Sequence, residues 1–205
     1  MCDLLSECCG PYRRFVLGFC FGLAIIAAVA VIVVLLLGYG RIYHLRVAVD
    51  DASLKRFAVT STAVSYNLTV SLAVRNPNWA MSVTYRSLEA AYLFDGHRFD
   101  SIAAISSEYV QSARRTAVFR LSTGADGANA SLGNAGTQEY LKEKDKGVFD
   151  VEVDLSGEVQ YQLHRTWCRL EAKCPLKLQL PTPDGGAVVF EKTTCEVLRS
   201  SQKGC

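Results

Sequence analysis

Residues 15–40 read FVLGFCFGLAIIAAVAVIVVLLLGYG, an unbroken run of 26 residues without a charge or a proline. An α-helix of this length reaches about 39 Å, and the hydrocarbon core of a bilayer is ~30 Å thick. Sixteen positions of the run are Phe, Val, Leu or Ile, which together favour insertion into a bilayer by about 5 to 10 kcal/mol. The run therefore predicts a single transmembrane helix at residues 15–40, between a short stub at 1–14 and a domain at 41–205.

Two alternatives to a membrane helix fit the run less well. A helix buried in a soluble core is disfavoured, because a chain of 205 residues has no core wide enough to enclose a long helix that is apolar on every face. A cleaved signal peptide stays open as an alternative, since Gly38-Tyr39-Gly40 has small residues at cleavage-like spacing. The apolar region of such a peptide is usually about 7 to 15 residues, which is shorter than this run.

Two signals point to opposite sides of the membrane. Basic residues follow the run more densely than they precede it, which alone would place the domain in the cytoplasm. Two glycosylation acceptor patterns, Asn67-Leu68-Thr69 and Asn129-Ala130-Ser131, and four cysteines also follow the run, as in a domain exposed to an oxidising compartment. We expect the stub at 1–14 to be cytoplasmic and the domain to be extracellular.

The N-terminal part carries two further candidate features. Cys2, Cys8 and Cys9 lie close to the membrane, where cysteines are candidates for palmitoylation; unmodified thiols are the alternative. Gly18 and Gly22 have the small-xxx-small spacing that lets two membrane helices approach closely. A homo-oligomer through this helix is therefore a further expectation.

The domain after the run is weakly charged. It carries 20 Lys and Arg against 18 Asp and Glu, a net charge of +2. This field is too weak to argue for binding of nucleic acid. We see no internal repeat and no low-complexity segment, and 165 residues can bury one adequate core, so we expect one domain.

Alternation of apolar and polar residues predicts β-strands through most of this domain. At residues 66–74, every second side chain is Tyr, Leu or Val, which gives one face to a core and one to solvent. Asn76-Pro77-Asn78 then ends the strand, because proline supplies no hydrogen-bond donor and asparagine favours turns. Asp95-Gly96 predicts a hairpin turn. The strands expected around and after it are 88–94, 97–105 and 114–121.

The second half of the domain continues this pattern. We expect Ser156-Gly157 to separate two strands, Pro181 and Asp184-Gly185-Gly186 to form a turn, and one short helix to follow a loop. The expected strands are 149–155, 159–163, 174–180 and 188–198, the loop is 122–136 and the helix is 137–146. Seven or eight short strands with turns between them predict a mainly β fold, an antiparallel β-sandwich with one short helix.

The order of several short motifs resembles a plant family. The strand ending Val74-Arg75-Asn76-Pro77-Asn78 precedes Tyr85-Arg86-Ser87-Leu88-Glu89-Ala90, Tyr92-Leu93-Phe94-Asp95-Gly96, Val151-Glu152-Val153-Asp154-Leu155 and Cys195-Glu196-Val197. Behind an N-terminal apolar run, this order resembles the NHL family, the harpin-induced and non-race-specific-disease-resistance-like proteins. Their outer domain is the late embryogenesis abundant subgroup 2 type, also called the water-stress and hypersensitive-response domain. The resemblance covers nearly the whole chain.

The resemblance implies a fibronectin-III-like β-sandwich on a single-pass plasma-membrane anchor, with roles in defence and in abiotic stress and without enzymatic activity. We expect it to act by contact with a protein, the cell wall or the lipid bilayer. The runner-up is a lipid-binding or transfer module with an apolar groove between the sheets, and a third hypothesis is a stabiliser of membranes under dehydration. In this chain Trp79-Ala80-Met81-Ser82 follows Asn-Pro-Asn, where family members often carry a basic or glycine-rich stretch.

The sequence carries no motif for catalysis, for a metal or for a cofactor. The three histidines, His44, His97 and His164, stand in no Gly-x-Ser-x-Gly or His-Glu-x-x-His context, and no glycine-rich phosphate loop is present. Cys168 and Cys174 are too far apart for a usual zinc pair. We therefore expect neither catalytic, metal nor cofactor-binding residues.

The cysteines and the Asn-Pro-Asn turn have structural interpretations. A disulfide between Cys174 and Cys195 would close a loop of about 20 residues and add about 3 kcal/mol of stability, with Cys168 unpaired or joined to Cys205; buried free thiols are the alternative. For Asn76-Pro77-Asn78 we favour a turn whose side chains satisfy nearby backbone groups over a binding loop. Trp79 is either an exposed contact or a lid over the core.

Overall fold

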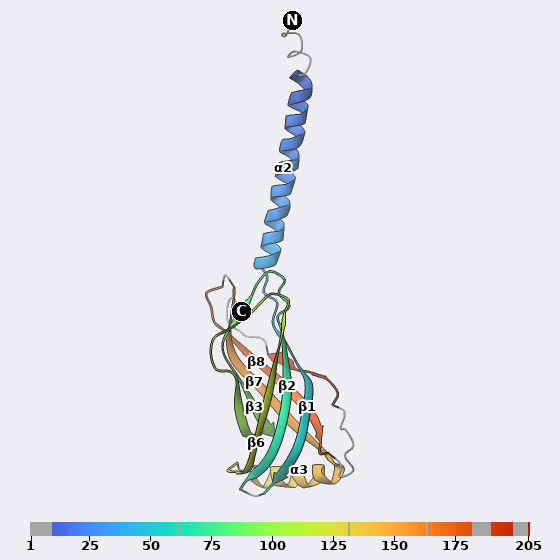
Figure 1. Ribbon diagram of the computed structural model, residues 1–205, viewed down its shortest axis with the longest axis vertical. Helices are drawn as coiled ribbons and strands as arrows, with labels where there is room; N and C mark the ends of the chain where they lie inside the picture. The colour runs from blue at the N-terminus through green and yellow to red at the C-terminus, as the bar shows by residue number, and fades with distance from the viewer. Residues whose placement is uncertain (1–9, 61, 131, 163, 182–189, 199–204) are drawn as a thin grey trace. The chain divides into compact units, whose positions relative to one another are not determined.

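The computed structural model describes residues 10–60, 62–130, 132–162, 164–181, 190–198 and 205. They form two compact units, Met1–Arg41 and Ile42–Cys205. The first is built on one long helix, α2 (Gly10–Tyr39), drawn in blue in Figure 1. The large side chains of its apolar segment are exposed on all sides. Among the described residues it is the one helix long and apolar enough to cross a bilayer, which is compatible with membrane anchoring.

The second unit is a sandwich of two antiparallel sheets, as predicted. One sheet has four strands in the order β6-β2-β1-β9 and the other has six, in the order β10-β8-β7-β3-β4 with β5 paired to β3. The four-stranded sheet contains β1 (Arg46–Val59), β2 (Val64–Arg75), β6 (Thr116–Ala128) and β9 (Thr193–Thr194). The six-stranded sheet contains β3 (Val83–Phe94), β4 (His97–Ile105), β5 (Tyr109–Gln111), β7 (Val148–Tyr161), β8 (Cys168–Gln179) and β10 (Glu196–Leu198).

The core lies between the two sheets. The core face predicted at residues 66–74 is confirmed, because every second side chain from Tyr66 to Val74 is buried there, whereas Ser71 and Ala73, expected to face solvent, are buried as well. Buried side chains of both sheets form one continuous hydrophobic cluster. Each Leu, Val or Phe in it contributes about 1.5 to 3 kcal/mol by leaving water. In the described part of the chain, the space between the sheets is therefore occupied by packed side chains.

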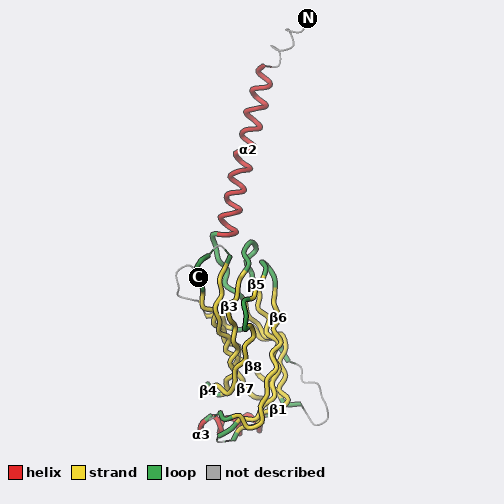
Figure 2. The backbone as a smooth tube through the Cα atoms, turned by 60° about the vertical axis from the view of Figure 1, so that its left-hand side comes forward, coloured by secondary structure: helices red, strands yellow, loops and turns green. Residues whose placement is uncertain are grey.

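One short helix, α3 (Gly133–Lys146), lies across one end of the sandwich (Figures 1 and 2). It begins four residues earlier than the predicted 137–146 and ends at the same residue. Its Tyr140 stacks on Phe149, with 5.9 Å between the ring centroids, and packs edge-on against Phe57. The helix thereby closes the core at this end.

Two predictions about the first sheet need correction. The strand β6 continues to Ala128 and so includes residues 122–128 of the segment predicted as a loop at 122–136, because residue 124 pairs with Asn67 and Ser122 pairs with Thr69. The alternation also failed to indicate β1. Its register shifts at Val49/Asp51 and at Leu54/Arg56, and each shift puts two exposed residues in a row, which breaks the period of two.

The prediction that Ser156-Gly157 ends a strand is wrong. The strand β7 runs without a break from Val148 to Tyr161. The neighbouring strand β3 has a register shift between Tyr85 and Ser87, which brings its backbone close to residue 157. A Cβ atom at Gly157 would lie 2.4 Å from the carbonyl oxygen of Ser87. Glycine stands here because the two backbones approach closely.

The prediction of one last strand at 188–198 is also wrong. The described part of it forms two short strands, β9 and β10, which belong to different sheets. Cys195 separates them and is bonded to Cys174 of β8, so the chain passes from one sheet to the other at the disulfide. The turn predicted at 184–186 lies outside the described residues.

Gly157→Ala is expected to destabilise the domain, because the added methyl group would overlap the Ser87 carbonyl and β3 would have to move. Overpacking of this kind costs about 1 to 3 kcal/mol. Ser156→Ala is the matched control, since Ser156 is exposed on the same strand. The measurement is thermal unfolding of the full chain in detergent, followed by circular dichroism. Equal melting temperatures for the two variants would contradict the close approach.

Candidate functional site

The two ends of the sandwich differ in construction. One end is covered by α3 and is called the α3 end. The opposite end is formed by four segments that lead into or out of strands, and we call it the Trp79 end (Figure 2). Its segments are 42–46, 75–83, 106–116 and the described residues of 161–168, which leave out 163. The strand register brings them together, since Arg75 pairs with both Arg46 and Thr116, and Val83 pairs with both Gln111 and Tyr161.

Asn78 binds the segment that leads into the domain. Its Oδ1 accepts a hydrogen bond from the backbone N–H of Tyr43 at 2.8 Å, and its Nδ2 donates to the carbonyl oxygen of Tyr43 at 2.8 Å. The side-chain amide thus pairs with both backbone groups of one residue, as a neighbouring strand would. Asn78 is fully buried, so these bonds are shielded from competing water.

Asn76 organises the turn itself. Its Oδ1 accepts from the backbone N–H of Asn78 at 3.0 Å and from Nδ2 of Asn78 at 2.9 Å. Its Nδ2 donates to the carbonyl oxygens of Met81 and Ser112, at 2.9 and 3.3 Å. Every donor of the two asparagine side chains is therefore used. This agrees with a turn whose side chains satisfy nearby backbone groups.

Gln111 extends the network across the sandwich. Its Nε2 donates to the carbonyl oxygens of Val74, at the end of β2, and of Arg115, at 2.9 and 2.8 Å. Its Oε1 accepts from the hydroxyl group of Tyr85 on β3. The bonds therefore connect the two sheets at this end. We call Asn76, Asn78 and Gln111 the amide hub.

The amide hub carries no charge. Its members are amides, and burial raises the pKa of the Tyr85 hydroxyl far above its usual value. Burial likewise raises the pKa of Tyr161, at the end of β7, to about 12. Neither tyrosine ionises at physiological pH. The hub is thus a positioning device, and it holds no group that could act as an acid or a base in catalysis.

The hub presents apolar side chains to solvent. Trp79 follows the hub directly and is 40 % exposed, and Tyr43 is 41 % exposed. On the adjacent segment, Tyr109 and Val110 are 39 % and 59 % exposed. Trp79 is therefore a partly exposed contact residue, while Met81, two residues later, is the side chain that enters the core.

The cysteines form two disulfides in the second unit. Cys174 is bonded to Cys195 and Cys168 to Cys205. They close loops with sequence separations of 21 and 37 residues, worth about 3 to 4 kcal/mol each in the chain-entropy account. Cys2, Cys8 and Cys9 lie outside the described residues.

The structure also locates the glycosylation and helix-packing candidates. Asn67 is exposed on the outer face of β2, and Asn129 is exposed in the loop before α3; Ser131 of the second pattern lies outside the described residues. On α2, a Cβ added at Gly18 or Gly22 would meet nothing within 4 Å. That helix surface is open in the described part.

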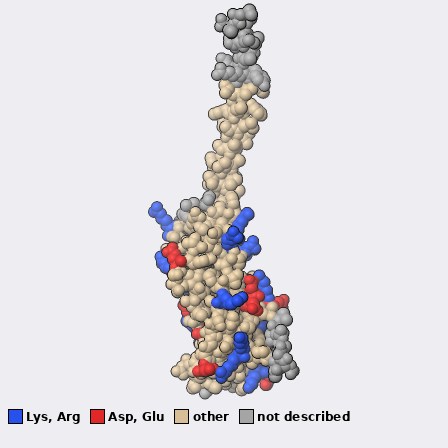
Figure 3. All heavy atoms as spheres, in the orientation of Figure 1, with Lys and Arg blue, Asp and Glu red and all other residues tan. Residues whose placement is uncertain are grey.

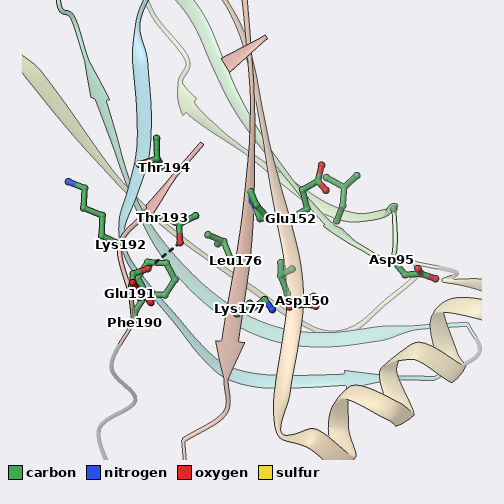
Figure 4. A pocket seen from close by; sticks show the side chains of 14 residues that line it. Asp95, Asp150, Glu152, Leu176, Lys177, Phe190, Glu191, Lys192, Thr193 and Thr194 are labelled. Carbon is green, nitrogen blue, oxygen red and sulfur yellow. Dashed lines mark hydrogen bonds between the residues drawn. The ribbon is translucent and has the colours of Figure 1, made fainter. Parts of the chain in front are cut away.

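A surface pocket of about 680 Å³ lies beside β7 and β8 (Figure 4). Its lining mixes acidic and basic side chains, among them Asp150, Glu152 and Lys177. Lys192 pairs with Asp50, and the Thr193 hydroxyl donates to the Glu191 carbonyl oxygen, the dashed line in Figure 4. These contacts form no nucleophile and base pair of the kind that catalysis requires.

The histidines and acids are not gathered into a site. His97 begins β4, near the α3 end, whereas His44 and His164 belong to segments of the Trp79 end. Among the described residues, no group of three or more His, Cys, Asp or Glu side chains could hold a metal ion. Sequence reasoning missed Gln111, because a single glutamine beside a three-residue strand gives no local signal.

Comparison with known proteins gives a consistent family. The family model described as late embryogenesis abundant protein, LEA_2, matches residues 71–180. The chain is 33 % identical to NDR1/HIN1-like protein 10 of Arabidopsis thaliana over 144 residues, covering 67 % of this chain and 62 % of that protein. It is 26 % identical to NDR1/HIN1-like protein 3 of the same plant, and the match covers 96 % of this chain and 87 % of that protein. It is 28 % identical to NDR1/HIN1-like protein 2 of Arabidopsis thaliana, and the match covers 72 % of this chain and 63 % of that protein.

The chain thus spans about three fifths of the length of two of these relatives. A solved structure of a protein from Archaeoglobus fulgidus matches with 10 % sequence identity and a TM-score of 0.36. The match covers 65 % of this chain and 98 % of the chain of that protein. That similarity is too low to support an argument.

Asn78→Ala is expected to lower the melting temperature and the folded yield of the full chain. The change removes the two hydrogen bonds between the buried Asn78 side chain and the backbone of Tyr43, at about 1 to 3 kcal/mol for each. Asn78→Asp keeps the shape and one acceptor but loses both donors, so it should be equally harmful. Asn129→Ala, in an exposed loop, is the control and should melt like the parent chain. A normal melting temperature for Asn78→Ala would show that the hub is dispensable for folding.

Proposed function

Because the chain belongs to the late embryogenesis abundant LEA_2 family, and to its NDR1/HIN1-like (NHL) members, a plant group related to stress and defence, we propose that it is a single-pass plasma-membrane protein without enzymatic activity. It acts in defence or abiotic-stress responses through contacts with a protein, the cell wall or the membrane. The proposed division is a cytoplasmic stub at 1–14, a membrane helix at 15–40 and an extracellular domain at 41–205.

The exposed apolar surface of α2 is the observation that carries the proposal. Large side chains such as Phe15, Ile26 and Leu36 are 65 % to 73 % exposed, and no partner for them exists within the described chain. In water this surface would be costly, whereas a bilayer solvates it. Gly18 and Gly22 offer a place for a second copy of the helix, so a homo-oligomer belongs to the proposal.

The disulfides support an extracellular domain. Both of them, Cys168–Cys205 and Cys174–Cys195, belong to the second unit. Disulfides persist in oxidising compartments and are rare in the cytosol. The exposed Asn67 and Asn129 point the same way, because N-linked glycans are added to surface segments of secreted chains. Cytoplasmic Cys2, Cys8 and Cys9 are then available for palmitoylation.

The mechanism is contact by a rigid domain that the membrane holds in place. The amide hub bonds Tyr43, near the start of the second unit, so this segment does not leave the domain without breaking buried hydrogen bonds. The alternative of lipid transfer would need an apolar groove between the sheets. The continuous cluster of packed side chains there counts against it.

Glycosylation tests the proposed side of the membrane. We expect the protein isolated from plant cells to shift in mobility after treatment with a peptide N-glycosidase that accepts plant glycans. Asn67→Gln together with Asn129→Gln should abolish the shift, because no other acceptor pattern follows the helix. Asn134→Gln, exposed at the start of α3 but in no acceptor pattern, should leave it unchanged. An unshifted parent protein whose domain is protected from protease in intact cells would reverse the topology.

Proximity labelling from the outer face of intact plant cells tests the proposed role. A defence function predicts that the labelled partners change after an elicitor is applied, and a role in abiotic stress predicts a change after salt or drought treatment. The control is the chain with its domain after residue 41 replaced by an unrelated extracellular domain. Partner sets that stay the same under all treatments would contradict the proposed role.

A further inference from the structure

The two ends of the sandwich differ in charge. The four segments of the Trp79 end carry one acidic residue, Glu108, against five arginines, Arg46, Arg75, Arg114, Arg115 and Arg165. The α3 end is nearly balanced, because the strand ends and α3 mix lysines and arginines with carboxylates. Figure 3 shows this contrast on one face, with more blue than red at the end of the domain opposite α3. The domain has a small net charge as a whole, but its positive charge is concentrated at the Trp79 end.

These arginines are not neutralised by their neighbours. None of the five forms an ion pair with a carboxylate in the part of the chain that the structure describes. Four arginines elsewhere in the domain are paired, in Arg56–Asp126, Arg86–Glu158, Arg98–Glu89 and Arg169–Glu171, whereas Arg120 on β6 stands singly among the described residues. Single exposed arginines are ordinary, but five together at one end create a local positive potential.

Arg114 occupies a position that normally suits glycine. Its φ angle is +59°, a left-handed conformation that residues with a Cβ disfavour. The backbone N–H of Arg114 donates to the carbonyl oxygen of Asn78 at 3.0 Å, so the amide hub holds the turn. Glycine at this position would remove the backbone strain. The presence of arginine instead indicates that the Arg114 side chain has a role.

Apolar side chains stand among the arginines. Trp79 follows Asn78 in the chain, and Arg114 is bonded to Asn78, so the ring and the guanidinium group belong to adjacent segments. Tyr109 and Val110 are exposed on the segment that contains Arg114. Trp and Tyr side chains concentrate where a membrane meets water, and arginine binds phosphate groups there.

The tether keeps this end near a membrane. Ile42 is the first residue of the second unit, and the apolar segment of α2 ends at Gly38. Four residues of fully extended chain span at most about 14 Å. If α2 crosses a bilayer, the first residue of the Trp79 end cannot leave the headgroup region by more than that distance.

We propose that the Trp79 end docks on the phospholipid headgroups of the membrane that holds α2, and that anionic headgroups strengthen this docking. The arginines bind lipid phosphates and carboxylates, and Trp79 inserts its ring at the level of the headgroups. This rests on the membrane anchoring proposed above. A soluble polyanion such as an acidic polysaccharide would match the arginines, but it would give no role to the exposed Trp79, Tyr109 and Val110.

The test uses the fluorescence of Trp79. The chain has two tryptophans, Trp79 and Trp167, so Trp167→Phe leaves one and keeps an aromatic ring beside Arg86. The full chain is placed in lipid nanodiscs of phosphatidylcholine alone, or of phosphatidylcholine and phosphatidylserine in equal parts. Docking predicts a blue shift of Trp79 emission, and quenching by lipids brominated near the headgroup, in the anionic discs. Salt at about 1 M should reverse both effects, because it shortens the Debye length to about 3 Å.

Substitutions identify the surface. Arg114→Gly retains the left-handed turn while it removes the charge, and Arg115→Gln removes a second charge. Each should lower the ratio of docked to undocked protein about fivefold. Lys55→Gln and Lys146→Gln remove exposed charges from the α3 end, and these matched controls should leave the quenching unchanged.

Three outcomes would overturn the proposal. The first is identical Trp79 emission in neutral and anionic discs that contain the inserted chain. The second is an equal loss of quenching in the Lys55 and Lys146 controls. The third is a shift of Trp79 emission in neutral discs on addition of polygalacturonate, which would assign this end to a polysaccharide. A chain that does not enter the discs at all would overturn the anchoring as well, whereas insertion without docking leaves the anchoring intact.

Discussion

The apolar surface of α2 is the constraint on which the rest of the structure depends. Its transfer from water to a bilayer is favoured by about 5 to 10 kcal/mol, which is comparable to the whole folding stability of a typical domain. Such a helix is compatible with membrane anchoring, and in the proposed function the folded part works at the edge of a membrane. The two disulfides and the closed core of the sandwich stabilise the second unit, as the proposed extracellular location would require.

The amide hub is the second element of this arrangement. Asn76, Asn78 and Gln111 are buried polar groups, and such groups are costly unless each finds its partners. Here they pair with the backbone of the incoming chain, of β2 and of the segment before β6, and with the Tyr85 hydroxyl group on β3. The end at which the chain enters the domain is thus held together by internal hydrogen bonds. This leaves its exposed side chains available for contact.

Local sequence patterns predicted what local chemistry determines. The strand at 66–74, the turn at Asn76-Pro77-Asn78 and the antiparallel sandwich follow from alternation and from turn residues. The strand β1 was not predicted, because two register shifts break its alternation. The strand β7 was predicted as two strands, because a glycine often ends a strand, whereas Gly157 marks a close approach of two backbones. The grouping of residues at the Trp79 end could not be predicted from the sequence. Its residues come from four distant segments, and only the register of the strands brings these segments together.

Alkaline extraction of plant membranes, followed by flotation in a density gradient, tests the central claim most directly. If α2 spans the bilayer, the full-length chain should stay with the lipid after an alkaline wash and float with it. Peripheral proteins should be released by the same wash. Recovery of the chain as a soluble monomer without detergent, with residues 15–40 still present by mass spectrometry, would contradict the account.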